Sequence, residues 1–80
     1  VELSKNEARI LYLLLSNPKA VVSRFELMDE LWQSDEFVDD NTLTVNINRL
    51  RAKLTSIGVS EDFIQTRRGI GYQIGLREND

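Results

Sequence analysis

The 80-residue chain contains no cysteine, no histidine and only one proline. Without cysteine it can form neither a disulfide nor a thiolate metal site, and without histidine it lacks the commonest metal ligand and the usual general base at neutral pH. We therefore expect no metal, no cofactor and no catalytic residue. An enzyme would need a pair of carboxylates, and the adjacent Asp39 and Asp40 are better explained as a helix cap.

The chain also has no apolar run near the ~20 residues that a membrane helix requires, and no signal-peptide pattern. These absences favour a cytoplasmic protein without a membrane partner. Eighty residues allow one domain, which we expect to span positions 1–80. The hydrophobic fraction of 41% is typical of a folded domain rather than a disordered tail.

Acidic and basic side chains are unevenly distributed along a chain whose net charge is −3. Residues 1–40 carry four basic and nine acidic side chains, whereas residues 41–77 carry six basic and two acidic ones. The second segment can present a basic surface to an anionic partner, because local potential matters more than total charge. The alternative is an accidental cluster of solvated charges.

Two capping boxes predict the first two helices. Ser4 with Glu7, and Ser23 with Glu26, have the spacing at which each side chain bonds the amide of the other residue. Pro18 should end the first helix, because proline disfavours helical geometry in the residue before it. The second helix is expected to bury five apolar side chains: Phe25, Leu27, Met28, Leu31 and Trp32.

A third and longer helix is predicted over about residues 41–57, capped by Asp39 or Asp40 and ended by Gly58. Its apolar residues are spaced alternately four and three positions apart, which places them on one side of the helix. They should form one core stripe: Leu43, Ile47, Leu50, Leu54 and Ile57. The opposite face contains no acidic side chain. Most of its residues are slim enough for the helix to approach the floor of a DNA major groove.

Residues 64–67 and 72–76 alternate as two strands, and the intervening RGIG has the glycines that a hairpin turn requires. Thr66, Arg67 and Arg68 should lie at the tip, where one arginine can enter a minor groove while the others hold phosphate. The alternative is a plain surface turn with solubilising charges. Tyr72 is expected in the core rather than as a base-stacking platform.

Together the helix and the hairpin supply a set of candidate DNA contacts. Arg49 can donate a forked pair of hydrogen bonds to guanine, Asn48 can pair with adenine, and Arg51 more plausibly meets phosphate. The complete set is Thr42, Thr44, Asn46, Asn48, Arg49, Arg51, Thr66, Arg67 and Arg68. An ordinary solvated surface is the alternative for any one of them, but the lack of carboxylates beside a basic hairpin favours DNA for the group.

Four motifs, LSKNEARILYLLL, VVSRFELMDELW, VDDNTLTVNINRLRAKL and IQTRRGIGYQI, together resemble the effector domain of OmpR/PhoB-type response regulators. They occur in the right order and spacing, and cover the chain from Val1 to about Leu76. The resemblance implies an α+β winged helix-turn-helix fold: three helices, a C-terminal β-hairpin wing and a short, truncated N-terminal sheet. It also implies sequence-specific binding of double-stranded DNA, with helix 42–54 in the major groove and wing 66–71 on phosphate or the minor groove.

The resemblance further implies several partners. A receiver domain, absent from this chain, would be phosphorylated by a cognate histidine kinase and would control homodimerisation on direct repeats in promoter DNA. The loop containing Gln33, Asp35 and Glu36 matches the segment that meets RNA polymerase in some members, although a merely solvated loop is the alternative. The third helix looks most like the Gram-positive branch associated with cell-envelope stress and peptide-antibiotic resistance. A winged helix used for protein interaction, without DNA binding, is the alternative function.

Overall fold

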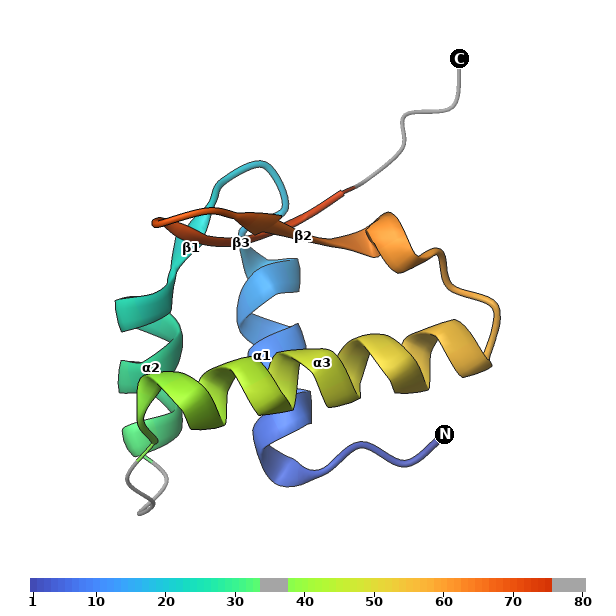
Figure 1. Cartoon of the computed structure of the whole chain (residues 1–80), viewed down its shortest axis with the longest axis horizontal. Helices are drawn as coiled ribbons and strands as arrows, with labels where there is room; N and C mark the ends of the chain where they lie inside the picture. Colours follow the sequence, from blue (N-terminus) through green and yellow to red (C-terminus); the bar gives the residue numbers. More distant parts are fainter. Residues whose placement is uncertain (34–37, 76–80) are drawn as a thin grey trace.

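The computed structural model describes residues 1–33 and 38–75. In chain order it contains α1 (Lys5–Ser16), β1 (Val22–Ser23), α2 (Arg24–Trp32), α3 (Asp40–Ser56), the short 3-10 helix η1 (Glu61–Phe63), β2 (Ile64–Arg67) and β3 (Gly71–Ile74). The three helices pack against one another, and a small sheet covers one end of the helical cluster (Figure 1). The prediction of three helices followed by a C-terminal hairpin is confirmed.

The first capping box forms as predicted. The hydroxyl of Ser4 accepts from the amide of Glu7 at 3.2 Å, and the carboxylate of Glu7 accepts from the amide of Ser4 at 2.7 Å. Glu7 is only 1% exposed, and its carboxylate also accepts a hydrogen bond from Nζ of Lys53 at 2.6 Å. The cap of α1 therefore also ties this helix to α3.

The second capping box forms only in part. The hydroxyl of Ser23 accepts from the amide of Glu26, but the carboxylate of Glu26 accepts from the Ser23 hydroxyl rather than from its amide. Ser23 belongs to β1 and pairs with Gly71 of β3. No strand is predicted before α2 from the sequence, so β1 is a further difference between the expectation and the structure.

Helix α2 buries fewer apolar side chains than predicted. Leu27 and Leu31 are fully buried and Met28 is half-buried, whereas Phe25 is 76% and Trp32 is 59% exposed. At about 100° per residue, Phe25 and Trp32 lie on one side of the helix, well away from the stripe of Leu27 and Leu31. The prediction that these two aromatic residues are buried is wrong.

Helix α3 begins after Asp39, whose carboxylate accepts from the amide of Thr42 at 2.8 Å. This hydrogen bond holds the pKa of Asp39 below its ordinary value. Gly58 follows the helix with φ 95°, as predicted. The core stripe is confirmed for four residues: Leu43, Ile47, Leu50 and Leu54. The prediction is wrong for Ile57, which is 57% exposed. This residue is the C-cap, so the helix ends before its side chain can join the stripe.

The three strands form an antiparallel sheet in the order β1-β3-β2. Arg67 pairs with Gly71 across the hairpin, and residues 68–70 form the turn. Gly71 permits the close approach of β1, because a Cβ at this position would lie 2.0 Å from the carbonyl oxygen of Val22. The short N-terminal sheet implied by the resemblance does not form within the described residues, because residues 1–3 are in no strand.

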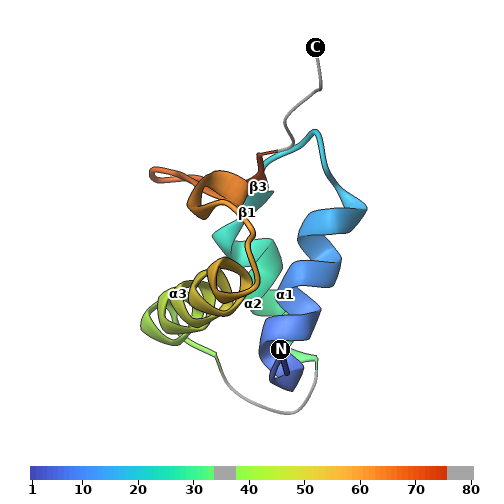
Figure 2. The same ribbon diagram turned by 90° about the vertical axis from the view of Figure 1, so that its right-hand side faces the viewer.

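The core lies where the helices meet the sheet. Its buried apolar residues are Ile10, Leu14, Val22, Leu27, Leu31, Val38, Leu43, Ile47, Leu50, Leu54, Ile64, Tyr72 and Ile74. Tyr72 is thus a core residue, as predicted. Figure 2 shows that α3 and the hairpin lie on the same side of the molecule, with α1 on the other side. Among the described residues, none of the helices has the length and apolar character needed to cross a bilayer.

We predict that Glu7→Gln destabilises the fold at neutral pH and flattens its response to acid. Burial acts to raise the pKa of Glu7, but the bonds from Lys53 and Ser4 outweigh it, so the pKa lies below its ordinary value of 4.5. A carboxylate with a lowered pKa stabilises the folded state above about pH 4.5, and this contribution is lost as the pH falls through the folded-state pKa. The variant should lose about 1–3 kcal/mol of unfolding free energy at pH 7.

Urea unfolding at pH 7 and along a series of acidic buffers measures both effects. As the pH falls below about 4.5, the stability of the wild type should approach that of Glu7→Gln. Glu30→Gln is the control at pH 7, because Glu30 pairs with Arg9 at 3.3 Å while one third exposed; it should cost less than about 1 kcal/mol. Parallel pH profiles for the wild type and Glu7→Gln would contradict the role of Glu7.

Candidate nucleic-acid interface

The side of α3 opposite the core stripe presents slim or basic side chains. Its exposed residues are Asn41, Thr44, Val45, Asn48, Arg49 and Ala52, and Thr42 is half-buried beside them. Within the described residues, neither Asn48 nor Arg49 makes a side-chain hydrogen bond or ion pair. Their donors are therefore available to a ligand without breaking any contact in the described part of the chain.

Asn46 does not belong to this outer face. It is 8% exposed, and its side-chain amide donates to the carbonyl oxygen of Thr42 at 2.9 Å. At about 100° per residue, position 46 lies within about 60° of Leu43 and Leu50, so burying the core stripe buries Asn46 as well. The prediction that Asn46 is on the groove-facing surface is wrong.

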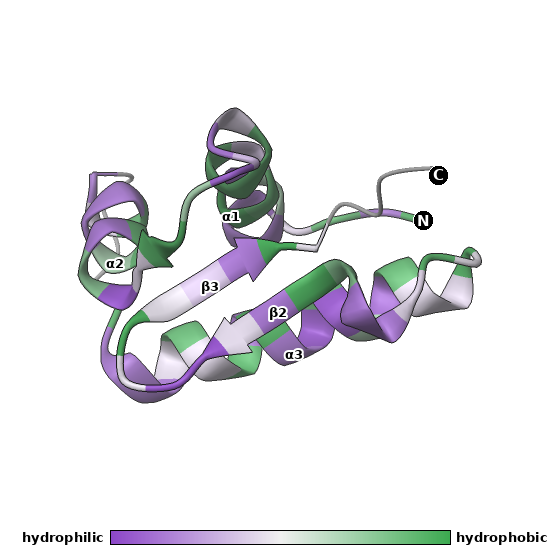
Figure 3. Cartoon of the chain, turned by 90° about the horizontal axis from the view of Figure 1, so that it is seen from above, coloured by the Kyte–Doolittle hydropathy of each residue, from purple (hydrophilic) through white to green (hydrophobic). Residues whose placement is uncertain are grey.

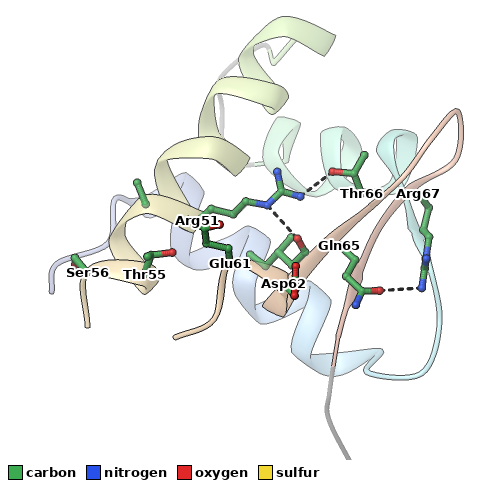
Figure 4. A pocket seen from close by; sticks show the side chains of 10 residues that line it. Arg51, Thr55, Ser56, Glu61, Asp62, Gln65, Thr66 and Arg67 are labelled. Carbon is green, nitrogen blue, oxygen red and sulfur yellow. Dashed lines mark hydrogen bonds between the residues drawn. The ribbon is translucent and has the colours of Figure 1, made fainter. Parts of the chain in front are cut away.

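Arg51 and Thr66, both predicted to meet DNA, are bonded to each other. Nη2 of Arg51 donates to Oγ1 of Thr66 at 2.7 Å, and Nε donates to the carbonyl oxygen of Ile64 at 3.0 Å. These bonds connect α3 with β2 across a groove that runs between the C-terminal half of α3 and the hairpin (Figure 4). Arg51 therefore uses two of its donors to hold the hairpin against α3.

The two adjacent arginines of the hairpin have different surroundings. Arg67 ends β2 and donates from Nη2 to Gln65 at 2.9 Å (Figure 4). Its Nε donates to Gln73, also at 2.9 Å. Arg68 lies in the exposed turn beside Gly69, whose φ of 73° is left-handed. In residues 1–33 and 38–75, Arg68 has no hydrogen-bond partner. Its guanidinium is thus the least engaged of the predicted wing contacts.

Arg24 is a central residue of this surface that the sequence motifs do not mark as functional. Its Nε donates to Oδ1 of Asp40 at 2.7 Å, its Nη2 donates to Oγ1 of Thr44 at 2.7 Å, and its Nη1 donates to the hydroxyl of Tyr72. Burial acts to lower the pKa of Arg24, but the bonds to Asp40 and Tyr72 outweigh it and raise the pKa. One signal was available in the sequence: a cation at the first position of a helix opposes the helix dipole, which indicates a specific acidic partner.

The predicted polymerase-contact loop is only partly described. Gln33 is exposed at the end of α2, and its side-chain amide donates to the carboxylate of Asp29 at 3.3 Å. Asp35 and Glu36 lie outside the described residues.

Three helices, the third lying beside a C-terminal hairpin with its outer face open, define a winged helix-turn-helix domain. Figure 3 shows this arrangement from the sheet side, with β2 passing over α3. The chain belongs to the family described as "transcriptional regulatory protein, C terminal", whose profile matches residues 1–74. Within that family it is the effector domain of an OmpR/PhoB-type response regulator, which confirms the resemblance seen in the motifs.

A curated relative supports this assignment. The chain is 50% identical over 72 residues to the sensory transduction protein BceR of Bacillus subtilis (strain 168), an alignment that covers 90% of this chain and 31% of BceR. The chain spans about a third of the length of the curated relatives it matches.

Two solved structures share the fold. The C-terminal domain of the nisin resistance regulator NsrR, a lantibiotic response regulator, matches with a TM-score of 0.79 and 50% identity, over 92% of this chain and 74% of that chain. The DNA-binding domain of the response regulator AdeR, solved in complex with an intercistronic region, matches with a TM-score of 0.79 and 28% identity, over 92% and 75% of the two chains. The predicted winged-helix fold is confirmed, and the relatives agree with the predicted Gram-positive envelope-stress branch.

We predict that Arg51→Ala lowers the free energy of unfolding by about 1–2 kcal/mol, because it removes two hydrogen bonds between α3 and β2. Arg49→Ala should change it by less than about 0.5 kcal/mol, since Arg49 is exposed on the same helix. Urea unfolding followed by circular dichroism compares the two variants directly. If both lose the same stability, Arg51 does not hold the hairpin in solution.

Proposed function

We propose that this chain binds double-stranded promoter DNA in a sequence-specific manner, as the effector domain of a two-component response regulator. The observation that carries the proposal is that α3, with its acid-free outer side, and the arginine-bearing hairpin lie on the same side of the molecule (Figure 2). The family membership supports the same function, as does the complex of AdeR with an intercistronic region.

In this proposal residues 42–54 of α3 enter the major groove. Arg49 donates to guanine O6 and N7, and Asn48 donates to and accepts from adenine or settles on phosphate. The guanidinium of Arg49, which has no partner among residues 1–33 and 38–75 and has slim neighbours such as Val45 and Ala52, supports this assignment. Thr42 and Thr44 lie in the N-terminal turns of α3, the end of the helix that would enter the major groove. Asn46 is left out, because its amide is buried.

The hairpin residues 66–71 would contact the backbone and the adjacent minor groove. We assign Arg68 to the minor groove, which attracts arginine most strongly where it is narrow and rich in A·T pairs. We assign Arg67 to a phosphate, since its glutamine partners hold the guanidinium at the surface of the sheet. We assign Arg51 and Thr66 to phosphate as well. They would make these contacts while keeping the hydrogen bond that joins them to each other.

The remaining partners belong to the longer protein that the curated relatives represent. We propose a cytoplasmic response regulator in which a receiver domain, phosphorylated by its histidine kinase, pairs two copies on direct repeats. We assign the contact with RNA polymerase to the end of α2, where Gln33 is exposed, together with the predicted residues Asp35 and Glu36, which lie outside the described residues.

Selection of a duplex from a random-sequence pool, followed by fluorescence anisotropy, tests the function. The chain is titrated against the selected duplex and a scrambled duplex at about 50 and about 200 mM salt. The selected duplex should bind more tightly at both concentrations, and both affinities should fall as salt rises, because phosphate contacts release counterions. Equal affinity for the two sequences, or no binding at low salt, would contradict sequence-specific recognition.

We predict that Arg49→Ala costs about 1–3 kcal/mol on the selected duplex and relaxes the base preference at one position. Arg67→Ala should instead weaken selected and scrambled duplexes by the same factor, because phosphate contacts carry no sequence information. Arg9→Ala is the matched control, since Arg9 pairs with Glu30 between α1 and α2. Repeating the selection with each variant measures the preference. A uniform loss for Arg49→Ala would show that Arg49 does not read a base.

A further inference from the structure

The two arginines that flank the interface both lie over the ring of one buried tyrosine. Tyr72 is 3% exposed. The Cζ atoms of Arg24 and Arg51 lie 5.5 Å and 5.9 Å from the centre of its ring, within the range of a cation–π contact. We refer to these three side chains as the Arg24–Tyr72–Arg51 cluster.

The cluster attaches α3 to the hairpin near both ends of the reading surface. Arg24 bonds the first turns of α3 through the carboxylate and carbonyl of Asp40 and the hydroxyl of Thr44, and bonds β3 through the Tyr72 hydroxyl. Its backbone amide also donates to the carbonyl oxygen of Ile70, in the hairpin turn, at 3.1 Å.

Arg51 makes the second attachment, to β2 through Ile64 and Thr66. Asp40 and Arg51 are eleven positions apart in the sequence, which corresponds to about 16 Å along the helix axis. Two attachments at different points along α3 restrain both the distance of the hairpin from α3 and its rotation about the first attachment.

The chemistry of the cluster suits a rigid connection. A guanidinium holds its donors in a planar fork, so one Arg24 side chain serves Asp40, Thr44 and Tyr72 at fixed mutual angles. The side chain of Arg24 is one quarter exposed but that of Asp40 is 71% exposed, so the connection depends on the geometry of the fork rather than on the strength of the ion pair. A lysine has a flexible stem and no planar fork, and cannot reproduce this geometry.

We propose that Arg24 is a positioning residue that, through Tyr72, fixes the wing relative to α3 and so fixes the spacing between the two DNA segments that the domain recognises. The proposal rests on the proposed function, because it requires both α3 and the wing to contact DNA. One base pair corresponds to 3.4 Å along the duplex and about one tenth of a turn. A rigid wing cannot follow such a displacement, whereas a hinged wing can.

The experiment compares two duplexes that differ in this spacing. Hydroxyl-radical footprinting of the wild-type chain on the selected duplex first locates the segments protected by α3 and by the wing. The second duplex carries one additional base pair between these segments. For each protein, the ratio of the two dissociation constants gives an insertion penalty, which does not change if a variant binds both duplexes more weakly by the same factor.

Two variants remove the connection in different ways. Tyr72→Phe keeps the buried ring and removes the hydroxyl to which Arg24 donates, and Arg24→Lys keeps the charge and removes the fork. The wild type should show an insertion penalty of about tenfold or more, the cost of roughly one lost bidentate contact. Both variants should show a penalty of about threefold or less, because a movable wing recovers its contact.

Arg9→Lys is the matched control, since Arg9 pairs with Glu30 and connects α1 with α2 rather than α3 with the hairpin. It should keep the penalty of the wild type. Circular dichroism verifies that each variant is folded, and Tyr72→Phe, which keeps the ring in the core, provides the measurement if Arg24→Lys does not fold.

The proposal is overturned if a folded Tyr72→Phe or Arg24→Lys keeps the penalty of the wild type, or if the wild type shows no penalty. In both cases the preference of the wild type for the selected over the scrambled duplex still reports on the proposed function. Loss of that preference overturns the proposed function and this inference together.

Discussion

Burial of the apolar stripe of α3 is the constraint on which the rest of the structure depends. Once Leu43, Ile47 and Leu50 pack into the core, the rotation of the helix about its axis is set, and every other side chain on it has a defined direction. Asn48 and Arg49 then face outward, while Asn46 is drawn into the core and Lys53 reaches Glu7 at the cap of α1. The same packing that stabilises the domain therefore selects the residues available for recognition.

Acidic side chains in the first half of the chain also influence which basic side chains remain available to a ligand. Glu7 caps α1 and pairs with Lys53, Asp39 caps α3, and Asp40 accepts from Arg24. Several of the acidic side chains in residues 1–40 therefore have structural roles. Two of them, Glu7 and Asp40, pair with the basic side chains Lys53 and Arg24, which connect elements of the fold. Arg49 and Arg68 have no acidic partner in the described part of the chain. Within the described residues, an overall acidic protein in this way leaves basic side chains on α3 and on the hairpin turn without acidic partners.

Features set by short stretches of sequence were predictable, and features set by contacts between distant elements were not. The cap of α1, the span of α3 and the left-handed Gly58 follow from local hydrogen-bonding and dihedral preferences. The bonds of Arg24 join residues 16 and 48 positions apart, and no local pattern encodes them. Strand β1 is equally non-local, because its two residues form a strand only by pairing with β3. Arg51 and Thr66 were likewise identified as candidate residues without their mutual bond, which joins two elements distant in the sequence.

The contact between Gly71 and β1 has a consequence for how wings of this kind can diverge. A side chain at position 71 would overlap the backbone of Val22, so this site admits only glycine. Arg68 and Ile70, one turn residue on each side of Gly69, point into solvent and meet no such restriction. Substitutions at these two turn positions can therefore alter the chemistry offered to a ligand, while Gly71 keeps the hairpin seated against β1.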